Sequence, residues 1–532
     1  QVLRYLGVDS DPVNWGWLSD KERFSFEAWN AEARLTGPLV RGDSLGNPSD
    51  DGDQLVAASW SLALRTAAAA LAGVHPDRIM VLGGARMTTE SQYAWAKLAK
   101  GILGTDNVDV QLGDGPSARV LLSLPRATID QVAAPGGTVV VLGLDAKETH
   151  GSLFLRLRHA VEHDGATLIE IAPRSTGLAG HAAHSLYPLP GELDSVITEL
   201  ASPTGATAGG VEGASIEAVS AALAAGPFTV VVGSGSLGDH PKVLESALLD
   251  LAEQYPDATF LPVPHRANTM GAIDMGLAPG LLPGRRTLDP TAAPESWSGI
   301  PAAVGSDTES LFRQAVDGGI DVAILLGCDP LTDFPDATLA ERAFNNVEHL
   351  ITVDTILNRT STGADVVFPA AATATEVDGT FTNVEGRLSA INRKVTPPGT
   401  ARPDWMIAAE LAAQMGTDLG FVDLDELWSD LASASPLHAG VDGEALADPD
   451  GHLLAAPTVV APAKPDVDVP TSSDLRLVVT RKMYDNGTML QHCPSLGELA
   501  GGASAALNPV QFKALGLSEG SEIKVTTQVG SV

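Results

Sequence analysis

The chain has 532 residues, which is too many for one hydrophobic core, so we expect three or four domains. It has 33 Lys and Arg residues and 66 Asp and Glu residues, which gives a net charge of −33. This charge argues against binding to nucleic acid or anionic lipid. It indicates a surface made for solubility, a salt-adapted host or a basic partner. The longest apolar runs have the length of strands, so no direct membrane span is expected.

Residues 1–44 form an aromatic lead-in segment in which Trp15, Trp17 and Trp29 lie close together. The segment has little room for a core of its own. We expect it to be irregular and to pack on another surface, either of this chain or of a partner. After residue 54 the pattern changes, and an Ala-rich helix is predicted over 55–71.

From residue 78 onward, short aliphatic runs that mostly end in glycine alternate with helical patterns. The predicted strands are 78–82, 138–142, 166–171, 228–232, 321–326 and 350–353. The predicted helices are 93–102, 152–163, 241–254 and 337–344. This alternation predicts βαβ units, and the continuously apolar strands predict parallel sheets that are covered on both faces. We therefore expect a doubly wound α/β fold in two lobes, 45–215 and 216–431, with a flexible stretch at 202–215.

The last hundred residues differ from the rest. Residues 432–473 are rich in Pro, Ala and Asp, have no clear period and are predicted to be a linker. Residues 475–480 and 520–526 have the composition of strands. We expect 474–532 to be a β-domain that is truncated, because its last strand is barely finished at Val532.

Glycines follow several of the predicted strands, namely Gly83, Gly143, Gly233, Gly235 and Gly327. In open α/β sheets, ligands bind outside the carboxyl ends of the strands, where glycine lets a backbone approach a phosphate closely. A nucleotide-like ligand is one interpretation. The other is that tight turns after strands need glycine in any case, since none of these turns forms G-x-G-x-x-G or a P-loop.

No catalytic set is visible, because neither G-x-S-x-G nor H-E-x-x-H occurs. His159 and His163 have helical i, i+4 spacing, which fits either a zinc pair or an exposed helix face. The only two cysteines, Cys328 and Cys493, argue against a disulfide framework and cannot themselves hold a four-thiolate iron–sulfur cluster. Cys328, at a strand end, is either a thiol near a ligand or a small packed side chain.

Several longer motifs carry a family resemblance. Residues 375–387, followed by 401–405, closely resemble the signature of molybdopterin oxidoreductases. Residues 266–276 and 325–335 resemble the branch of that superfamily formed by the G subunit of NADH-quinone oxidoreductase, which is respiratory complex I. Residues 507–520 resemble the C-terminal β-barrel that caps a pterin dinucleotide. The resemblance implies a molybdopterin oxidoreductase-like fold with a partial C-terminal β-barrel over 474–532.

The chain departs from the catalytic members of this family at two places. These members carry a Cys, selenocysteine or Ser ligand to the metal shortly after a stretch like Asn107–Asp109, but here no thiol follows and the first serine is Ser117. Asp114 is a carboxylate, and its glycine-flanked loop predicts solvent exposure. Ser19 replaces a cysteine expected to bind an iron–sulfur cluster, so residues 1–44 are predicted to be a remnant of an iron–sulfur-type segment.

The resemblance therefore implies a pterin site without its metal. The vestigial pterin-site candidates are Gly83, Gly143, Pro173, Arg174, Gly233, Gly327 and Asp329. No catalytic residue, metal or other cofactor is expected in this chain. The [2Fe-2S] and [4Fe-4S] clusters of the full subunit are expected before Gln1.

The implied role is a scaffold region of the large iron–sulfur subunit of NADH-quinone oxidoreductase, peripheral on the cytoplasmic side of the membrane. It would be bound to other peripheral-arm subunits. One alternative is a free-standing molybdenum or tungsten oxidoreductase of formate dehydrogenase type, and residues 110–117 discriminate, because such an enzyme needs a metal ligand there. A third possibility is an inactive scaffold in another dehydrogenase or hydrogenase-like assembly.

Overall fold

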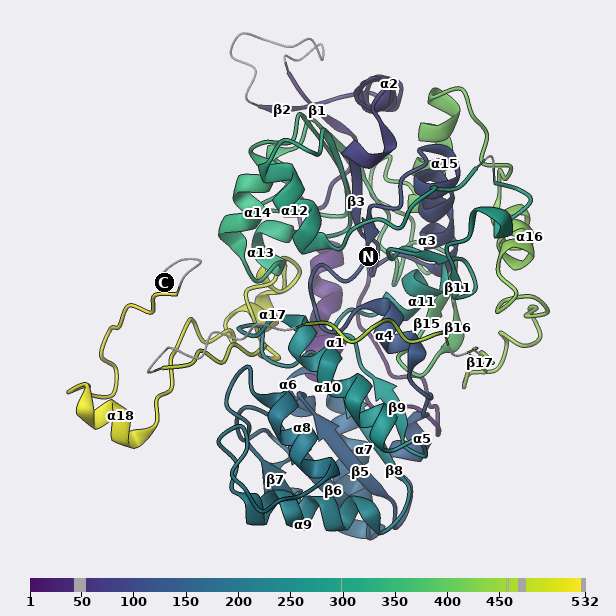
Figure 1. Cartoon of the computed structure of the whole chain (residues 1–532). Helices are drawn as coiled ribbons and strands as arrows, with labels where there is room; N and C mark the ends of the chain where they lie inside the picture. The colour runs from purple at the N-terminus through teal and green to yellow at the C-terminus, as the bar shows by residue number, and fades with distance from the viewer. Residues whose placement is uncertain (43–53, 298, 456, 458, 467–474, 528–532) are drawn as a thin grey trace.

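The computed structural model describes residues 1–42, 54–297, 299–455, 457, 459–466 and 475–527. Two α/β lobes lie one above the other in Figure 1. The C-terminal segment, whose last helix is α18 (Pro509–Ala514), extends to one side of both lobes. The two-lobed doubly wound architecture predicted from the sequence is thus confirmed.

The lower lobe is built on a five-stranded parallel sheet in the order β7-β6-β5-β8-β9. Its strands are β5 (Thr138–Leu142), β6 (Thr167–Ile171), β7 (His184–Leu186), β8 (Phe228–Val232) and β9 (Thr259–Pro262). Val140 faces α8 (Leu193–Ala201), α9 (Gly213–Ala224) and α10 (Pro241–Gln254), whereas Val139 and Val141 face α5 (Ile129–Val132) and α7 (Gly151–His163). Burial on both faces explains why these strands are continuously apolar.

The upper lobe is built on a seven-stranded sheet in the order β2-β1-β14-β13-β12-β3-β4. The strands are β1 (Leu39–Arg41), β2 (Leu55–Ala57), β3 (Ile79–Gly83), β4 (Val108–Asp109), β12 (Val322–Leu326), β13 (His349–Asp354) and β14 (Val366–Pro369). Strand β1 is antiparallel to both of its neighbours, β2 and β14, so the sheet is mixed. Residues 55–57 are thus a strand rather than the start of the predicted helix, because they pair with β1.

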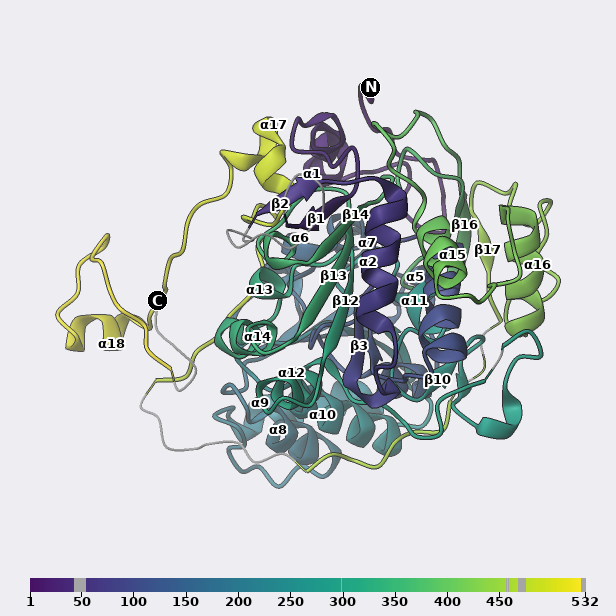
Figure 2. The same ribbon diagram turned by 90° about the horizontal axis from the view of Figure 1, so that it is seen from above.

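Helices cover both faces of the seven-stranded sheet, as the view from above shows (Figure 2). One side carries α2 (Trp60–Leu71), α3 (Thr89–Ala96), α15 (Asp404–Gln414) and α16 (Leu424–Ala434). The other side carries α12 (Thr308–Val316), α13 (Pro330–Asp333) and α14 (Ala337–Phe344). The predicted helices 241–254 and 337–344 agree with α10 and α14 to the residue.

The predicted lobe boundary at residue 215 is wrong. Strand β8 pairs with β5 across that boundary, and β12 pairs with β3 across the whole lower lobe. The upper lobe is therefore discontinuous in sequence, with the lower lobe inserted between β4 and β12. Local sequence pattern specifies strands but not their neighbours, so the boundary could not be read from periodicity.

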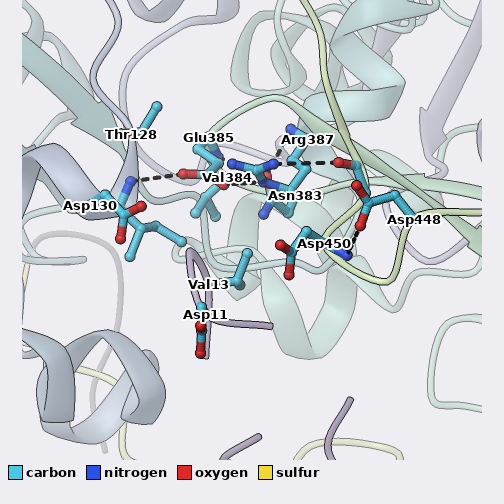
Figure 3. Close-up of polar contacts among 12 residues, drawn as sticks. Asp11, Val13, Thr128, Asp130, Asn383, Val384, Glu385, Arg387, Asp448 and Asp450 are labelled. Atoms are coloured by element: carbon cyan, nitrogen blue, oxygen red, sulfur yellow. Dashed lines mark hydrogen bonds and ion pairs between the residues drawn. The ribbon is translucent and has the colours of Figure 1, made fainter. Parts of the chain in front are cut away.

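The family signature lies in the hairpin of β15 (Gly379–Thr382) and β16 (Arg387–Ile391) and ties the lobes together (Figure 3). Glu385 accepts a hydrogen bond from the backbone N–H of Ile129 in the lower lobe at 2.8 Å and pairs with Arg387 at 2.6 Å. Arg126 donates to the carbonyl of Val384 at 2.7 Å. These contacts give the signature a structural role at the lobe interface.

The N-terminal segment packs on the rest of the chain through some of its aromatic residues and exposes others. The guanidinium of Arg156 lies 4.2 Å from the Trp15 ring, and that of Arg34 lies 5.6 Å from the Trp29 ring. Trp17 and Phe24, by contrast, are 55% and 38% exposed. Packing on this chain and packing on a partner therefore both stay open as interpretations of this segment. Part of its aromatic surface is covered by this chain, and part is exposed.

Of the two strands predicted in the C-terminal domain, 475–480 is not a strand, and 520–526 contains a single bridge residue, Thr526, within the described residues. Within 475–527 the structure contains α17 (Pro494–Gly497) and α18 but no strand, and residues 475–485 run extended against the lower lobe. A strand needs a partner for its backbone groups, and residues 475–480 find a side chain and one loop amide instead. The region 432–473 is irregular where it is described after α16, apart from β17 (His452–Leu453).

None of the helices in the described part of the chain combines the length and the apolar character needed to cross a bilayer.

A buried ion pair anchors the N-terminal segment to the signature. Arg34 and Glu376 are joined by two hydrogen bonds of 3.0 and 2.7 Å, and both side chains are almost fully buried. Arg34→Met should destabilise the protein by about 3–5 kcal/mol, because it leaves the Glu376 carboxylate buried without a counter-charge. Thermal unfolding measures this loss.

The matched control is Arg313→Met, which removes an exposed pair with Glu309 on α12. It should cost less than about 1 kcal/mol. Equal losses for the two variants would show that the Arg34 pair contributes no more than a surface pair.

Candidate functional site

The five-stranded sheet has the topology that creates a ligand crevice. Its central strands β5 and β8 are neighbours, but the chain leaves them toward opposite edges of the sheet, to β6 and β9. At such a switch point the loops after the strands diverge and leave a crevice at the carboxyl ends. Gly143 follows β5, Pro173 and Arg174 follow β6, and Gly233 follows β8, so the structure brings these four predicted residues to one edge.

Loops from both sides line this crevice. The lower lobe contributes Gly143, Asp145, His150, Arg174, Thr176, Ser234, Gly235 and His265. The C-terminal segment contributes Thr480 and Arg481. Gly143, Pro173, Ser234 and Gly235 also line an adjoining apolar pocket that reaches the start of α10. Sequence analysis found the strand-end residues but missed the two histidines and the C-terminal residues, which carry no motif.

The glycines are required by packing. A Cβ at Gly233 would lie 2.3 Å from the carbonyl oxygen of Gly143, and one at Gly83 would lie 2.5 Å from that of Leu326. Gly143 and Gly327 have φ of +61° and +58°, which favours glycine. The tight-turn interpretation therefore accounts for these positions without a ligand.

The other three predicted residues belong to the seven-stranded sheet. Gly83 and Gly327 follow the paired strands β3 and β12. Asp329 is buried and accepts hydrogen bonds from the N–H of Thr360 at 3.0 Å and from the hydroxyl of Thr332 at 2.9 Å. Its carboxylate thus braces two loops of the upper lobe. The structure separates the seven candidates into two groups on two sheets.

Asp114 is buried, in contrast to the prediction that its loop is exposed. The loop turns inward through Leu112, Gly113 and Gly115, all with positive φ, and the side chain is only 7% exposed. Its carboxylate pairs with Arg481 at 3.0 Å and with Arg266 at 3.5 Å. Glycines flanking a carboxylate allow a loop to fold in either direction, so the sequence alone did not decide burial.

The electrostatics around Asp114 favour its ionised form. Burial raises the pKa of Asp114, but Arg481 and Arg266 outweigh this effect and hold the pKa below its ordinary value. Burial lowers the pKa of His265 to about 3 and that of His150 to about 4, so both imidazoles are neutral near pH 7. The arginines therefore supply the positive charge that faces Asp114.

The residues present do not fit the metal of the catalytic relatives. The carboxylate in the 110–117 loop, Asp114, is engaged by two arginines, and Ser117 donates its backbone N–H to Glu245 outside the crevice. Cys328 is buried with its thiol toward the Leu82 carbonyl, and Cys493 packs against Ala28. Throughout the described ranges, no three His, Cys, Asp or Glu side chains are arranged to hold a metal ion.

Ser19 has a local structural role. It is the N-cap of α1 (Asp20–Phe24), where its hydroxyl accepts from the N–H of Glu22 at 3.3 Å and the Glu22 carboxylate accepts from the N–H of Ser19 at 2.7 Å. This capping box explains why serine suits the position. The loss of an iron–sulfur cluster there stays a prediction.

Two lobes with parallel strands, a crevice at a topological switch point and a signature hairpin between the lobes define a doubly wound α/β protein of two lobes. A family model described as molybdopterin oxidoreductase matches residues 34–208 and 229–414, which is more than half of the chain. The chain belongs to the molybdopterin oxidoreductase family.

The chain is similar to subunits of several oxidoreductases. The chain is 30% identical to the G subunit of NADH-quinone oxidoreductase from Mycobacterium bovis over 100% of its own length, and 28% identical to the NADPH-Fe(3+) oxidoreductase subunit alpha of Geobacter sulfurreducens over 98%. It spans 63% and 66% of those two proteins. It is also 26% identical to the F420-dependent formate dehydrogenase 2 subunit alpha of Methanococcus maripaludis, covering 98% of this chain and 86% of that one.

The fold is shared with acetylene hydratase from Pelobacter acetylenicus, with a TM-score of 0.61 at 15% identity. The likeness covers 83% of this chain and 71% of the hydratase. It supports the molybdopterin oxidoreductase-like fold and says nothing of the reaction.

Substituting the glycine at the switch point tests the packing account. Gly233→Ala should destabilise the protein by about 1–3 kcal/mol, because the new methyl group would overlap the Gly143 carbonyl. Gly226→Ala is the matched control, since nothing lies within 4 Å of a Cβ there. Chemical denaturation compares the two variants, and an unchanged Gly233→Ala variant would mean that the turn has room for a side chain.

Proposed function

We propose that this chain is a scaffold region of the large iron–sulfur subunit of an NADH-quinone oxidoreductase. In this role it supports electron transfer from NADH to quinone without a redox centre of its own. The observation that carries the proposal is that the loop after β4 holds no thiol and that its one carboxylate, Asp114, is ion-paired with Arg266 and Arg481. Similarity to the G subunit of that enzyme over the whole chain supports the same role.

The scaffold role places the redox centres and partners elsewhere. The [2Fe-2S] and [4Fe-4S] clusters would belong to a segment of the full subunit preceding Gln1, and the other peripheral-arm subunits would be the partners. The assembly would lie on the cytoplasmic side of the membrane. Trp17 and Phe24 are exposed apolar side chains that suit an interface with such a neighbour.

The alternative is a molybdenum or tungsten oxidoreductase of formate dehydrogenase type. It is favoured by one comparison, since the chain spans more of the formate dehydrogenase alpha chain than of the NADH-quinone oxidoreductase relative. Against it stand the absence of a thiol in the 110–117 loop and the two arginines that pair with Asp114.

Elemental analysis discriminates between these functions. The full chain, produced in a host that makes the pterin cofactor and is supplied with molybdate and tungstate, should contain neither metal, because the 110–117 loop has no thiol and its one carboxylate is paired with two arginines. A formate dehydrogenase alpha subunit produced in the same way is the positive control. Stoichiometric molybdenum or tungsten in this chain would overturn the scaffold proposal and support the alternative.

Copurification tests the assembly. The chain, tagged and expressed in its source organism, should copurify with NADH-oxidising peripheral-arm subunits. Replacing Trp17 and Phe24 by Ala should weaken this association, whereas Val422→Ala, at a more exposed apolar position on the upper lobe, should not. A monodisperse chain that purifies alone would contradict the role as a subunit.

A further inference from the structure

Residues 476–483 cross the mouth of the crevice. This segment contains Arg476, Arg481 and Lys482 and no acidic residue, although the chain as a whole has a net charge of −33. It contacts the loops that follow β8, β7, β6 and β5, as well as Asp114 after β4. We name these eight residues the basic strap.

Main-chain contacts hold the basic strap close to the sheet edge. The N–H of Leu237 donates to the carbonyl of Val479 at 2.9 Å, and the N–H of Val479 donates to the hydroxyl of Ser236 at 3.2 Å. A Cβ at Gly238 would lie 2.7 Å from the carbonyl oxygen of Leu477. At the far end the N–H of Met483 donates to the carboxylate of Glu148 at 3.0 Å.

Each cationic side chain of the strap pairs with a carboxylate from a different loop. Arg476 pairs with Glu192 at 2.6 Å, Arg481 pairs with Asp114 at 3.0 Å, and Lys482 pairs with Glu148 at 3.1 Å.

Arg174, a predicted pterin-site residue, is also engaged. It pairs with Asp145 at 3.0 Å and donates to the hydroxyl of Thr480 at 3.2 Å. The groups that would face the phosphates of a dinucleotide are thus committed to the strap or to one another.

The charge of the crevice explains why the basic strap lies across it. Its loops contribute Asp114, Asp145, Glu148 and Glu192, against Arg174 and Arg266. An excess of carboxylates repels phosphate and attracts a cationic peptide. We propose that the crevice is a binding site for a basic peptide segment, and that its occupant is this chain's own strap, which closes it against anionic ligands.

The proposal goes beyond the proposed function, because it holds in whichever assembly the chain works. Its test measures access to the strap rather than metal content, so the two ideas fail separately.

Trypsin measures strap access directly, since it cuts after Arg and Lys. In the full chain, cutting after Arg476, Arg481 and Lys482 should be slow compared with cutting after Lys513 in the protruding α18, whose residues are not buried. The double variant Glu148→Gln, Glu192→Gln removes two pairs and should raise the cutting rate in the strap by about tenfold. High salt should act in the same direction, because it screens the partly exposed pairs.

Asp321→Asn is the matched control, since it removes the Arg78 pair on the upper lobe and should leave strap cutting unchanged. Mass spectrometry assigns the cuts. Adding inorganic pyrophosphate should not accelerate cutting in the strap; acceleration would show that an anion displaces the strap, and it would overturn the selectivity for a basic peptide. Strap cutting that is fast in the unaltered chain, or that does not respond to the double variant, would overturn the closure itself.

Discussion

Asp114 lies in a loop that leaves the seven-stranded sheet, and its buried carboxylate faces two arginines from distant parts of the chain. Arg266 follows β9 in the lower lobe, and Arg481 belongs to the C-terminal strap. One carboxylate therefore joins both lobes and the segment that covers them. Because a buried charge is costly without its partners, the three groups must be placed together, and the position of the loop, the lobes and the strap depend on one another.

The insertion of the lower lobe between β4 and β12 makes such contacts necessary. Chain segments enter and leave the lower lobe at its junction with the upper one, and the lobe interface must satisfy the polar groups of several loops there. Asn268 satisfies two such backbone groups. Its side-chain amide donates to the Met87 carbonyl at 2.8 Å and accepts from the N–H of Thr382 at 2.9 Å. The family signature works in the same way through Glu385 and Arg387. The family signature therefore has an architectural role in this chain.

The contacts at the lobe interface agree with the proposed scaffold role. A region that only supports redox centres elsewhere needs a fixed shape, and it needs neither an open crevice nor a reactive side chain. Burial keeps the imidazoles of His150 and His265 neutral at neutral pH, so neither is a proton donor in its cationic form, and the carboxylate of Asp114 is paired with two arginines. The acidic crevice and the basic strap then replace the contacts that a bound cofactor would make between the lobes.

The sequence alone determined the local elements and the family. The pattern of apolar residues located β5, β8 and β12 and predicted α10 and α14 to the residue. A strand buried on both faces is continuously apolar, and a helix buried on one face is apolar at helical spacing, so both leave a pattern in neighbouring positions. It also placed Gly143, Pro173, Arg174 and Gly233 at strand ends, where a crevice forms.

Only the tertiary structure decided which strands are neighbours, so the lobe boundary at 215 was wrong and Gly83, Gly327 and Asp329 lie on the other sheet. The burial of Asp114 and the extended course of 475–480 were also decided by the tertiary structure. Each depends on a partner more than a hundred residues away in sequence, and no local pattern records such a partner.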